Sequence, residues 1–542
     1  MKAARGITII FILSVLLLTG RVAYLVEVSR CVRAGTHICS YNTDLVLDDA
    51  YISFRYAANF ANGQGLVYNL GERVEGYTNF LWTLLLGVGR WSGMEIPILA
   101  QVLAGAAGIG VLLVMAAFAR RWLKDRPDSV LLAGLPMLLF AGLGGTARFV
   151  FSGMETLFFT FLAVLSVYFF LYNNRAWLIG GIFAVCALTR PEGILLFLIC
   201  LGFGLIYQGC VAGGAYRFHN KRLALELLAG FCLLYLPYFI ARWVYFGYPL
   251  PNTYYAKVDG LSWQRLERGW MILSGQIGAW GLIPLLMLAM GSLFSVKREP
   301  YWLLLVVLVA AFFGLFVMVG GDFYTWFGPR LLLPVLPFFL WMTAEGLYNL
   351  TRLPIFPSMT RVPLQAALGV LLLGYVIWFS WPARTSDLES LANQMHAWKE
   401  LGIWMKANLP ANAWIATDAA GLIPYYSRLR SIDMFGLTDV HIAHLQIHQP
   451  GAGIAAHEKY DPTYILARKP DCIVATFIDS TGQPLSAGLP MVAGQFMQNY
   501  HLVAVAKSRG DPPVDGHWVL GVKSLQAEQF HQGYQSGLFC LK

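Results

Sequence analysis

Long apolar runs recur along the chain and stop near residue 382. Each is about 17–25 residues long, enough for a helix to cross roughly 30 Å of hydrocarbon. From Arg384 onward the charged residues return, and no apolar run is long enough to span a bilayer. The pattern predicts a polytopic α-helical membrane domain over residues 1–384 and a soluble α/β domain over residues 385–542.

Basic clusters between the runs determine the expected topology, because loops rich in Lys and Arg stay in the cytoplasm. All the dense clusters can be cytoplasmic if about eleven helices span the membrane. An odd number of spans from a cytoplasmic N-terminus places the C-terminal domain outside. The predicted spans cover residues 6–26, 97–119, 129–146, 154–172, 176–189, 193–209, 223–245, 277–295, 301–319, 331–350 and 362–382.

Residues 80–91 are apolar but are not counted as a span, because an extra crossing would place the basic cluster around Arg120 outside. We expect an interfacial or re-entrant helix there, within a first outer loop over residues 27–96. Composition agrees with a membrane protein, since 57% of residues are apolar and 13% are charged. The net charge of +9 is explained by cytoplasmic loops, so no nucleic-acid partner is expected.

The cysteines divide according to this topology. Cys31 and Cys39 share the first outer loop, and Cys472 and Cys540 share the C-terminal domain. An oxidising exterior permits two disulfides with these pairings, and free thiols are the alternative.

Acidic residues of the membrane domain gather on its outer side, and several lie near helix ends, where a charge is costly unless it is paired or functional. For Glu155 and Glu192 the alternative is helix capping, because a carboxylate favours the positive end of the helix dipole. A cap explains only one of the adjacent residues Asp48 and Asp49, so we expect this pair to be functional. Asp322 follows two glycines that let the backbone approach a ligand closely.

These groups suit glycosyl transfer, which needs a base for the acceptor hydroxyl and cations for a phosphate leaving group. Asp48 or Asp49 suits the first task, and either could also hold a divalent cation such as Mg, Mn or Ca. Because no nucleotide-sugar pool exists outside the cell, the donor must be carried by the membrane. The expected donor-phosphate site contains Arg55, Arg190, Lys257, Asp322 and Arg330.

Short motifs follow one another along most of the chain. They are LDDAYISFRYA at 47–57, GQGLVYN at 63–69, EGYTNFLW at 75–82, SGMET at 152–156, TRPEG at 189–193, PNTYYAK at 251–257, GGDF at 320–323 and GLTD at 436–439. The set resembles a family of GT-C glycosyltransferases that includes the mycobacterial terminal arabinofuranosyltransferases, which use decaprenyl-phosphate arabinofuranose.

The resemblance implies a first-loop acidic base, Asp48 or Asp49, a polyprenyl-phosphate sugar donor and an inverting single displacement. It favours arabinofuranose or a related pentose as the sugar, with an extracytoplasmic glycan, lipid or protein as acceptor. It also implies a bacterial inner membrane protein whose active site faces the periplasm. In the first loop, Glu75 and Tyr77 are expected to contact the acceptor.

In the C-terminal domain, residues 396–408 have helical spacing and residues 414–417 and 471–475 resemble buried strands. Residues 418–426 form the expected strand-to-helix turn. We expect this domain to shape an acceptor groove, with Tyr425 and Tyr426 as sugar-stacking residues. The histidines at 441, 444 and 448 lie at helical spacing and suggest either a metal site or surface side chains.

Two other functions fit parts of the pattern. A transporter or flippase of a lipid-linked glycan predicts acids near the middle of the bilayer, and only Glu226 and Glu345 depart from the outer ends. A non-catalytic assembly or sensor protein has no need for adjacent aspartates at 48 and 49.

Overall fold

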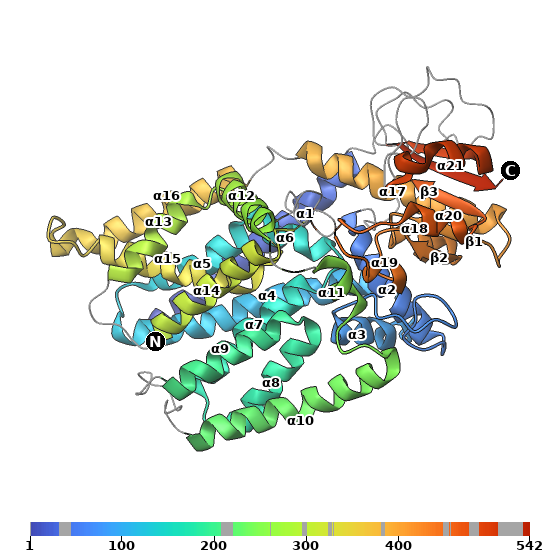
Figure 1. The fold of residues 1–542 in the computed structure, drawn as a ribbon. Helices are drawn as coiled ribbons and strands as arrows, with labels where there is room; N and C mark the ends of the chain where they lie inside the picture. The colour runs from blue at the N-terminus through green and yellow to red at the C-terminus, as the bar shows by residue number, and fades with distance from the viewer. Residues whose placement is uncertain are drawn as a thin grey trace.

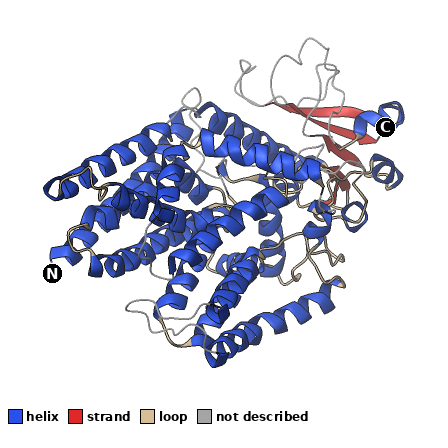
Figure 2. Ribbon diagram, turned by 60° about the vertical axis from the view of Figure 1, so that its left-hand side comes forward, coloured by secondary structure: helices blue, strands red, loops and turns tan. Residues whose placement is uncertain are grey.

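The computed structural model describes residues 2–31, 45–206, 221–258, 260, 262–294, 301–322, 328, 330–380, 385–447, 455, 457–475, 487–507 and 535–541. Residues 2–380 form a body of helices, and residues 385–541 form a C-terminal domain that contains the sheet (Figures 1 and 2). Both the N terminus and the sheet lie at the edges of the molecule, on opposite sides of the helical body (Figure 1).

The helical body follows the apolar runs of the sequence. Its helices are α1 (Lys2–Cys31), α2 (Asp48–Ala61), α3 (Phe80–Arg90), α4 (Ile96–Trp122), α5 (Val130–Gly142), α6 (Gly144–Phe151), α7 (Thr156–Tyr172), α8 (Ala176–Thr189), α9 (Glu192–Ile206), α10 (Lys221–Phe246), α11 (Asn252–Lys257), α12 (Trp263–Ala279), α13 (Ile283–Gly291), α14 (Tyr301–Met318), α15 (Leu336–Leu350) and α16 (Arg361–Phe379).

Among the described residues, five helices are long and apolar enough to cross a membrane, and the bent pairs α5–α6 and α12–α13 raise the number to seven. Shorter apolar helices are α3, α7, α8 and α9. Each predicted span overlaps one of the long, bent or short apolar helices, or α15. The predicted α-helical class of this body is therefore confirmed. The number of eleven crossings stays a prediction, because α7, α8, α9 and α15 each have fewer than 18 residues.

The helix expected at residues 277–295 differs most from the structure. Helix α12 already begins at Trp263, and the chain turns by 99° before α13. Gly281 lies in this turn with a φ of +64°, a left-handed conformation that favours glycine. The last residues of α12 and those of α13 together read as one apolar run, so apolar periodicity does not detect the break.

The C-terminal domain is built on a five-stranded sheet in the order β2-β1-β3-β5-β4. Strands β1 (Trp414–Thr417), β2 (Arg430–Asp433) and β3 (Cys472–Ala475) are parallel, while β4 (Tyr500–Lys507) and β5 (Gln535–Leu541) complete the sheet in antiparallel fashion. Its helices are α17 (Thr385–Asn408), α18 (Leu422–Ser427), α19 (Val440–Ala443), α20 (Pro462–Ala467) and α21 (Ala493–Asn499). The predicted strands at 414–417 and 471–475 and the helix at 396–408 are confirmed.

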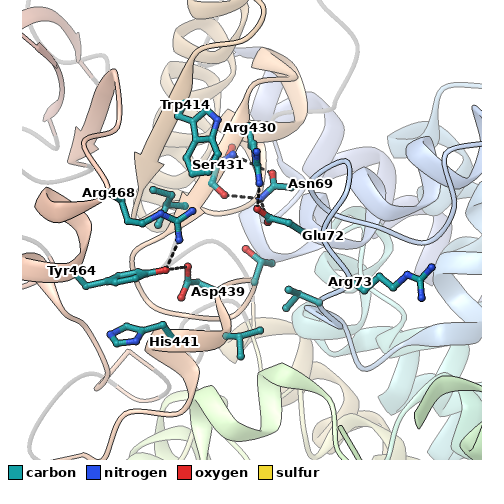
Figure 3. A pocket seen from close by; sticks show the side chains of 14 residues that line it. Asn69, Glu72, Arg73, Trp414, Arg430, Ser431, Asp439, His441, Tyr464 and Arg468 are labelled. Atoms are coloured by element: carbon teal, nitrogen blue, oxygen red, sulfur yellow. Dashed lines mark hydrogen bonds and ion pairs between the residues drawn. The ribbon is translucent and has the colours of Figure 1, made fainter. Parts of the chain in front are cut away.

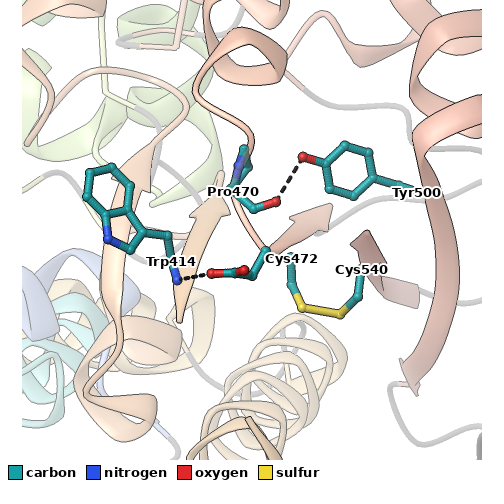
Figure 4. Close-up of a disulfide and its surroundings, with 6 residues drawn as sticks. Trp414, Pro470, Cys472, Tyr500 and Cys540 are labelled. Atoms are coloured by element: carbon teal, nitrogen blue, oxygen red, sulfur yellow. Dashed lines mark hydrogen bonds between the residues drawn. A yellow bond between two sulfur atoms is a disulfide. The ribbon is translucent and has the colours of Figure 1, made fainter. Parts of the chain in front are cut away.

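A disulfide joins Cys472 to Cys540 across the adjacent strands β3 and β5 (Figure 4). The same region is held by the Trp414 backbone N–H, which donates to Asp471 at 2.8 Å, and by the Tyr500 hydroxyl, which donates to the Pro470 carbonyl at 2.9 Å. The predicted Cys472–Cys540 pairing is therefore confirmed. The other proposed pairing includes Cys39, which lies outside the described residues.

The carboxyl ends of β1 and β2 lie at the same edge of the sheet because the two strands are parallel. The loops that follow them, at residues 418–421 and 434–439, contact the helical body at α2 and α11. Open α/β sheets commonly bind ligands at this edge. The sheet therefore presents the carboxyl ends of its parallel strands to α2 and α11.

Helices α8 and α10 approach closely enough for their backbones to touch. A Cβ atom on Gly180 would lie 2.0 Å from the Leu227 carbonyl oxygen, and one on Gly230 would lie 1.9 Å from that of Trp177. Small residues at such contacts are typical of helices that pack inside membranes, where close van der Waals contact drives association.

We expect Gly230→Ala to lower the thermal unfolding temperature in detergent, because the added methyl group must push α10 away from α8. Overpacking of this kind costs about 1–3 kcal/mol. Gly202→Ala on α9 is the matched control, since a Cβ atom at that position would have no neighbour within 4 Å. Equal unfolding temperatures for the two variants would contradict the assigned contact.

Candidate active site

Helix α2 begins at the two adjacent aspartates and packs between α3 and α18 (Figure 1). Most of its first ten residues are buried, including Tyr51 and Phe54. The Tyr51 ring lies 5.2 Å from that of Tyr425 and 5.7 Å from that of Tyr426. These contacts fix α2 against the C-terminal domain and so determine where the aspartates point.

Asp48 binds the C-terminal domain directly. Its two carboxylate oxygens accept hydrogen bonds from the backbone N–H groups of Gly421, at 3.1 Å, and Leu422, at 2.7 Å. A side chain on Gly421 would collide with the Asp48 carbonyl oxygen, since its Cβ would lie 1.8 Å away. The aspartate is 6% exposed. Asp48 thus forms a latch between the two domains.

Burial raises the pKa of Asp48 to about 7. The hydrogen bond from the Leu422 N–H lowers the pKa of Asp48, while the neighbouring charge of Asp49 raises it further. The carboxyl group of the latch therefore changes charge near neutral pH.

Asp49 faces the helical body. One of its oxygens lies 3.7 Å from the Arg330 guanidinium, whose other terminal nitrogen lies 2.7 Å from Asp322. The Asp49 side chain is 21% exposed, more than twice the exposure of Asp322. Burial alone would lower the pKa of Arg330, but Asp322 and Asp49 raise it overall. The two aspartates therefore hold a permanent buried cation between them.

A second cluster adjoins this one. The Arg190 guanidinium binds Glu155 at 2.5 Å and Glu192 at 2.8 Å. Asn79 donates to the second oxygen of Glu155 at 2.6 Å and accepts from Ser53 of α2 at 2.9 Å. The carboxylate of Glu155 therefore binds Arg190 and Asn79, with no capping hydrogen bond to the start of α7. Because Arg190 and Glu155 also act electrostatically on Arg330, the two clusters form one site.

Lys257, at the end of α11, is partly buried and forms no ion pair with any described residue. Its charge and those of Asp49 and Asp322 all act on His457 of the C-terminal domain. The structure thus brings Asp49, Asp322 and Arg330 together. The charge of Arg190 acts on Arg330, and that of Lys257 acts on His457.

Arg55 has a different set of partners. Its three guanidinium nitrogens donate to the carbonyl oxygens of Tyr68, Pro424 and Leu429 at 2.6–2.7 Å, and one of them also reaches Asn69. Since Pro424 and Leu429 belong to the C-terminal domain, this buried arginine ties α2 to that domain.

The residues expected to bind an acceptor are mostly packed. Glu75 is buried in an ion pair with Arg242, with an Nε–Oε2 distance of 2.9 Å. Tyr77 is 3% exposed, and its ring meets that of Tyr56 edge-on at 4.7 Å. Tyr425 and Tyr426 are half-buried against α2. Their acceptor role stays a prediction.

Three of the sequence motifs converge beside these residues. The Asn252 backbone N–H donates to the Glu75 carbonyl at 3.0 Å, and the Asn252 amide donates to the carbonyls of Gly436 and Leu437 at 2.8 and 3.1 Å. The motifs at 75–82, 251–257 and 436–439 are therefore one structural unit at the domain boundary.

A cavity of about 290 Å³ lies between the first loop and the sheet (Figure 3). The Arg430 guanidinium pairs with Glu72 and stacks on Trp414 at 3.9 Å. Arg468 donates to the Tyr464 hydroxyl at 2.7 Å, which donates to Asp439 at 3.1 Å. The walls therefore offer one ion pair, further charged groups and aromatic rings.

The metal hypotheses gain no structural support in the described part of the chain, where no three His, Cys, Asp or Glu side chains are placed to hold an ion. His441 lies 3.1 Å from Asp461, and His444 stacks on Tyr255 at 4.4 Å. His448 lies outside the described residues. Sequence reasoning missed His457 and Glu458, because no motif surrounds them and their partners are distant in the chain.

We expect the stability of the wild-type protein to fall, relative to that of Asp48→Asn, as the pH rises from 4 to 7. A carboxyl group whose pKa is raised on folding stabilises the protein below its unfolded pKa, and this contribution is lost as pH rises through the folded pKa. A shift of about three pKa units corresponds to at most about 4 kcal/mol in the free energy of unfolding. Thermal unfolding in detergent across this pH range measures the difference, and superimposed profiles for the two proteins would contradict it.

Comparison with known proteins agrees with this architecture. Residues 387–520 match a domain of unknown function (DUF8728). A segment of 244 residues is 30% identical to the terminal beta-(1->2)-arabinofuranosyltransferase of Mycobacterium tuberculosis (strain ATCC 25618 / H37Rv), covering 42% of this chain and 37% of that protein. The match thus spans less than half the length of this curated relative.

Two solved structures resemble nearly the whole chain. ArnT from Cupriavidus metallidurans bound to undecaprenyl phosphate superposes with a TM-score of 0.52 at 14% identity, over 96% of this chain and 98% of ArnT. Its apo structure gives a TM-score of 0.51 over the same shares. The protein therefore has the fold of ArnT.

Proposed function

We propose that this protein is a glycosyltransferase that moves a sugar from a polyprenyl-phosphate donor to an acceptor outside the cytoplasm. The observation that carries the proposal is the site itself, in which the Asp49 carboxylate lies 3.7 Å from the Arg330 guanidinium, on which the charge of Arg190 also acts. A solved structure with the same fold binds undecaprenyl phosphate, which supports a lipid-phosphate donor.

The chemistry follows from these groups. A carboxylate takes the proton of the acceptor hydroxyl, whose oxygen attacks the anomeric carbon as the bond to the carrier phosphate breaks. The phosphate leaves with a negative charge that preorganised cations stabilise. We assign this task to Lys257, because Arg190 and Arg330 already neutralise carboxylates.

Asp49 is the better candidate for the base. Both oxygens of Asp48 are bound by backbone N–H groups, and its side chain is nearly inaccessible. Asp49 is partly exposed and lies in the polar cluster. A general base must reach the proton it removes, so geometry favours Asp49. A divalent cation at either aspartate stays a prediction.

The sugar and the acceptor rest on weaker support. The partial match to an arabinofuranosyltransferase favours arabinofuranose or a related pentose. The cavity between the first loop and the sheet is the best acceptor site, because its walls combine the Arg430–Glu72 ion pair with hydrogen bonds from Arg468 to Tyr464 and from Tyr464 to Asp439. Such walls suit neutral hydroxyl groups, which both donate and accept hydrogen bonds, better than they suit a free anion.

A bacterial inner membrane location, with the site on the periplasmic side, completes the proposal. The transport alternative loses its main support, because both acids that suggested an ion path are paired locally. Glu345 binds Arg126 at 2.7 Å, and Glu226 binds Arg222 at 3.0 Å on the same helix.

We expect Asp49→Asn to lower transfer from a polyprenyl-phosphate pentose by about 10²-fold or more, since that is the usual contribution of a general base. Asp48→Asn is the matched control. We expect it to lower transfer by a smaller factor, because it weakens the contact between the two domains and leaves the Asp49 carboxylate in place. Transfer of radiolabelled sugar by purified protein measures both. Full activity of both variants would overturn the assigned base, and no transfer of any lipid-linked sugar by the wild type would overturn the function.

We expect Arg468→Gln to raise the KM for the acceptor about tenfold, the effect of losing about 1.4 kcal/mol of binding. The KM for the donor should stay unchanged, because Arg468 lines the cavity and contacts neither aspartate. Lys469→Gln is the matched control, an exposed cation next in the chain. An equal change in both KM values would argue against an acceptor site in the cavity.

A further inference from the structure

Helix α12 reaches the ends of α14 and α16, two helices that are long and apolar enough to span a membrane. A Cβ atom on Gly269, within α12, would lie 2.3 Å from the carbonyl oxygen of Val317, one residue before the end of α14. A Cβ atom on Gly281, just after α12, would lie 2.6 Å from the ring of Phe379, the last residue of α16. Because the chain then turns by 99° into α13, α12 lies across this end of the helical body.

One side of α12 contacts the turn that carries Asp322. The Arg268 guanidinium donates to the Gly320 carbonyl at 3.0 Å, and a Cβ atom on Gly321 would lie 2.7 Å from the Ile272 side chain. Both glycines have positive φ angles. The sequence predicted that this pair lets the backbone approach a ligand, and in the structure the pair admits α12.

The same side of α12 carries two buried arginines. Arg265 is 2% exposed and Arg268 is 9% exposed. The Glu458 carboxylate of the C-terminal domain lies 3.5 Å from the first guanidinium and 2.8 Å from the second. The positive charges of the helix therefore point into the protein.

The opposite side of α12 carries exposed tryptophans. Trp263 is 77% exposed and Trp270 is 62% exposed. Seven residues make nearly two turns, so the two indoles lie only about 20° apart around the helix axis. A helix at the surface of a soluble domain has the reverse arrangement, with charges in water and apolar side chains inside. The outer side of α12 is therefore built for an apolar surrounding.

A third side of α12 is polar and exposed. Gln264 and Glu267 both lie there, and Gln264 is rotated by about 120° from Trp270 around the helix axis. A helix with one apolar and one polar exposed side is typical of the boundary between lipid and water. Trp378, beside the contact between α16 and Gly281, is 80% exposed, and tryptophan is enriched at this boundary.

We propose that α12 lies in the membrane interface, with Trp263 and Trp270 inserted among the lipid headgroups and the upper acyl chains of the bilayer. The two indoles continue the apolar surface of the membrane helices, which exposes Met318 at the end of α14 and Trp378 at the end of α16. The contact with lipid does not depend on the transfer reaction. One consequence does rest on the proposed function, namely that α12 holds the Asp322 turn at the depth of a carrier-lipid phosphate.

Fluorescent labelling at single positions tests the contact. Trp270→Cys receives an environment-sensitive fluorophore, Gln264→Cys is the matched control on the same helix, and the labelled wild type measures the background from native cysteines. The proteins are reconstituted into vesicles of phosphatidylethanolamine and phosphatidylglycerol that also contain a phosphatidylcholine with a nitroxide near the top of its acyl chain.

We expect the nitroxide lipid to quench the label at position 270 at least about twofold more strongly than the label at position 264, because the apolar side of an interfacial helix lies about 5–10 Å deep. Iodide added to the water should quench the two labels in the opposite order. Trp263→Cys should behave like Trp270→Cys, and unfolding temperatures like that of the wild type show that the substitutions leave the fold intact.

Equal quenching by lipid at positions 264 and 270, or stronger quenching by iodide at position 270, would overturn the proposal. Shielding of position 270 from both quenchers would also overturn it, since that is the result expected if a second copy of the chain covered α12. Because no measurement here uses sugar transfer, these outcomes are separate from failure of the proposed function.

Discussion

The structure depends on a buried carboxylate that crosses a domain boundary. Asp48 begins a helix of the helical body, and its oxygens bind backbone N–H groups at the edge of the sheet. Because Gly421 has no side chain, the two backbones meet at van der Waals distance. This contact fixes the rotation of α2 about its own axis, and therefore fixes where Asp49 points. The same helix is held by Arg55, which binds carbonyl groups on both sides of the boundary.

Burying so many charges is costly unless each has a partner, because the desolvation of an isolated ion far exceeds any packing gain. In this site each positively charged side chain lies between two negatively charged ones. Asp49, Arg330 and Asp322 form one series, and Glu155, Arg190 and Glu192 form another. A site arranged this way can accept a phosphate or a developing negative charge through small changes in pairing. A lone buried cation or carboxylate would instead change its protonation state.

Much of the fold could be predicted from the sequence, because its signals are local. Apolar runs marked the helices, and the strands at 414–417 and 471–475 were recognised from short buried segments. The helix break at Gly281 and the strands at 430–433, 500–507 and 535–541 were not recognised, although residues 502–506 form a short apolar run. The acidic and basic residues of the site were recognised one by one, but their partners were not, since Asp49 and Arg330 are 281 positions apart. Arg55 matched the expected chemistry of a phosphate ligand, yet its contacts hold the domains together.

The two adjacent aspartates cannot share one task, for a geometric reason. Successive residues on an α-helix are rotated by about 100°, since 3.6 residues complete one turn. If one carboxylate faces the C-terminal domain, its neighbour must face a different wall, and here that wall carries Arg330. The doublet therefore links the two domains to the cluster around Arg330, because the bonds of Asp48 to the sheet edge fix the helix on which Asp49 lies. A single aspartate at either position would provide one of these contacts without the other, which accounts for a pair of like charges that a helix N-terminus alone does not require.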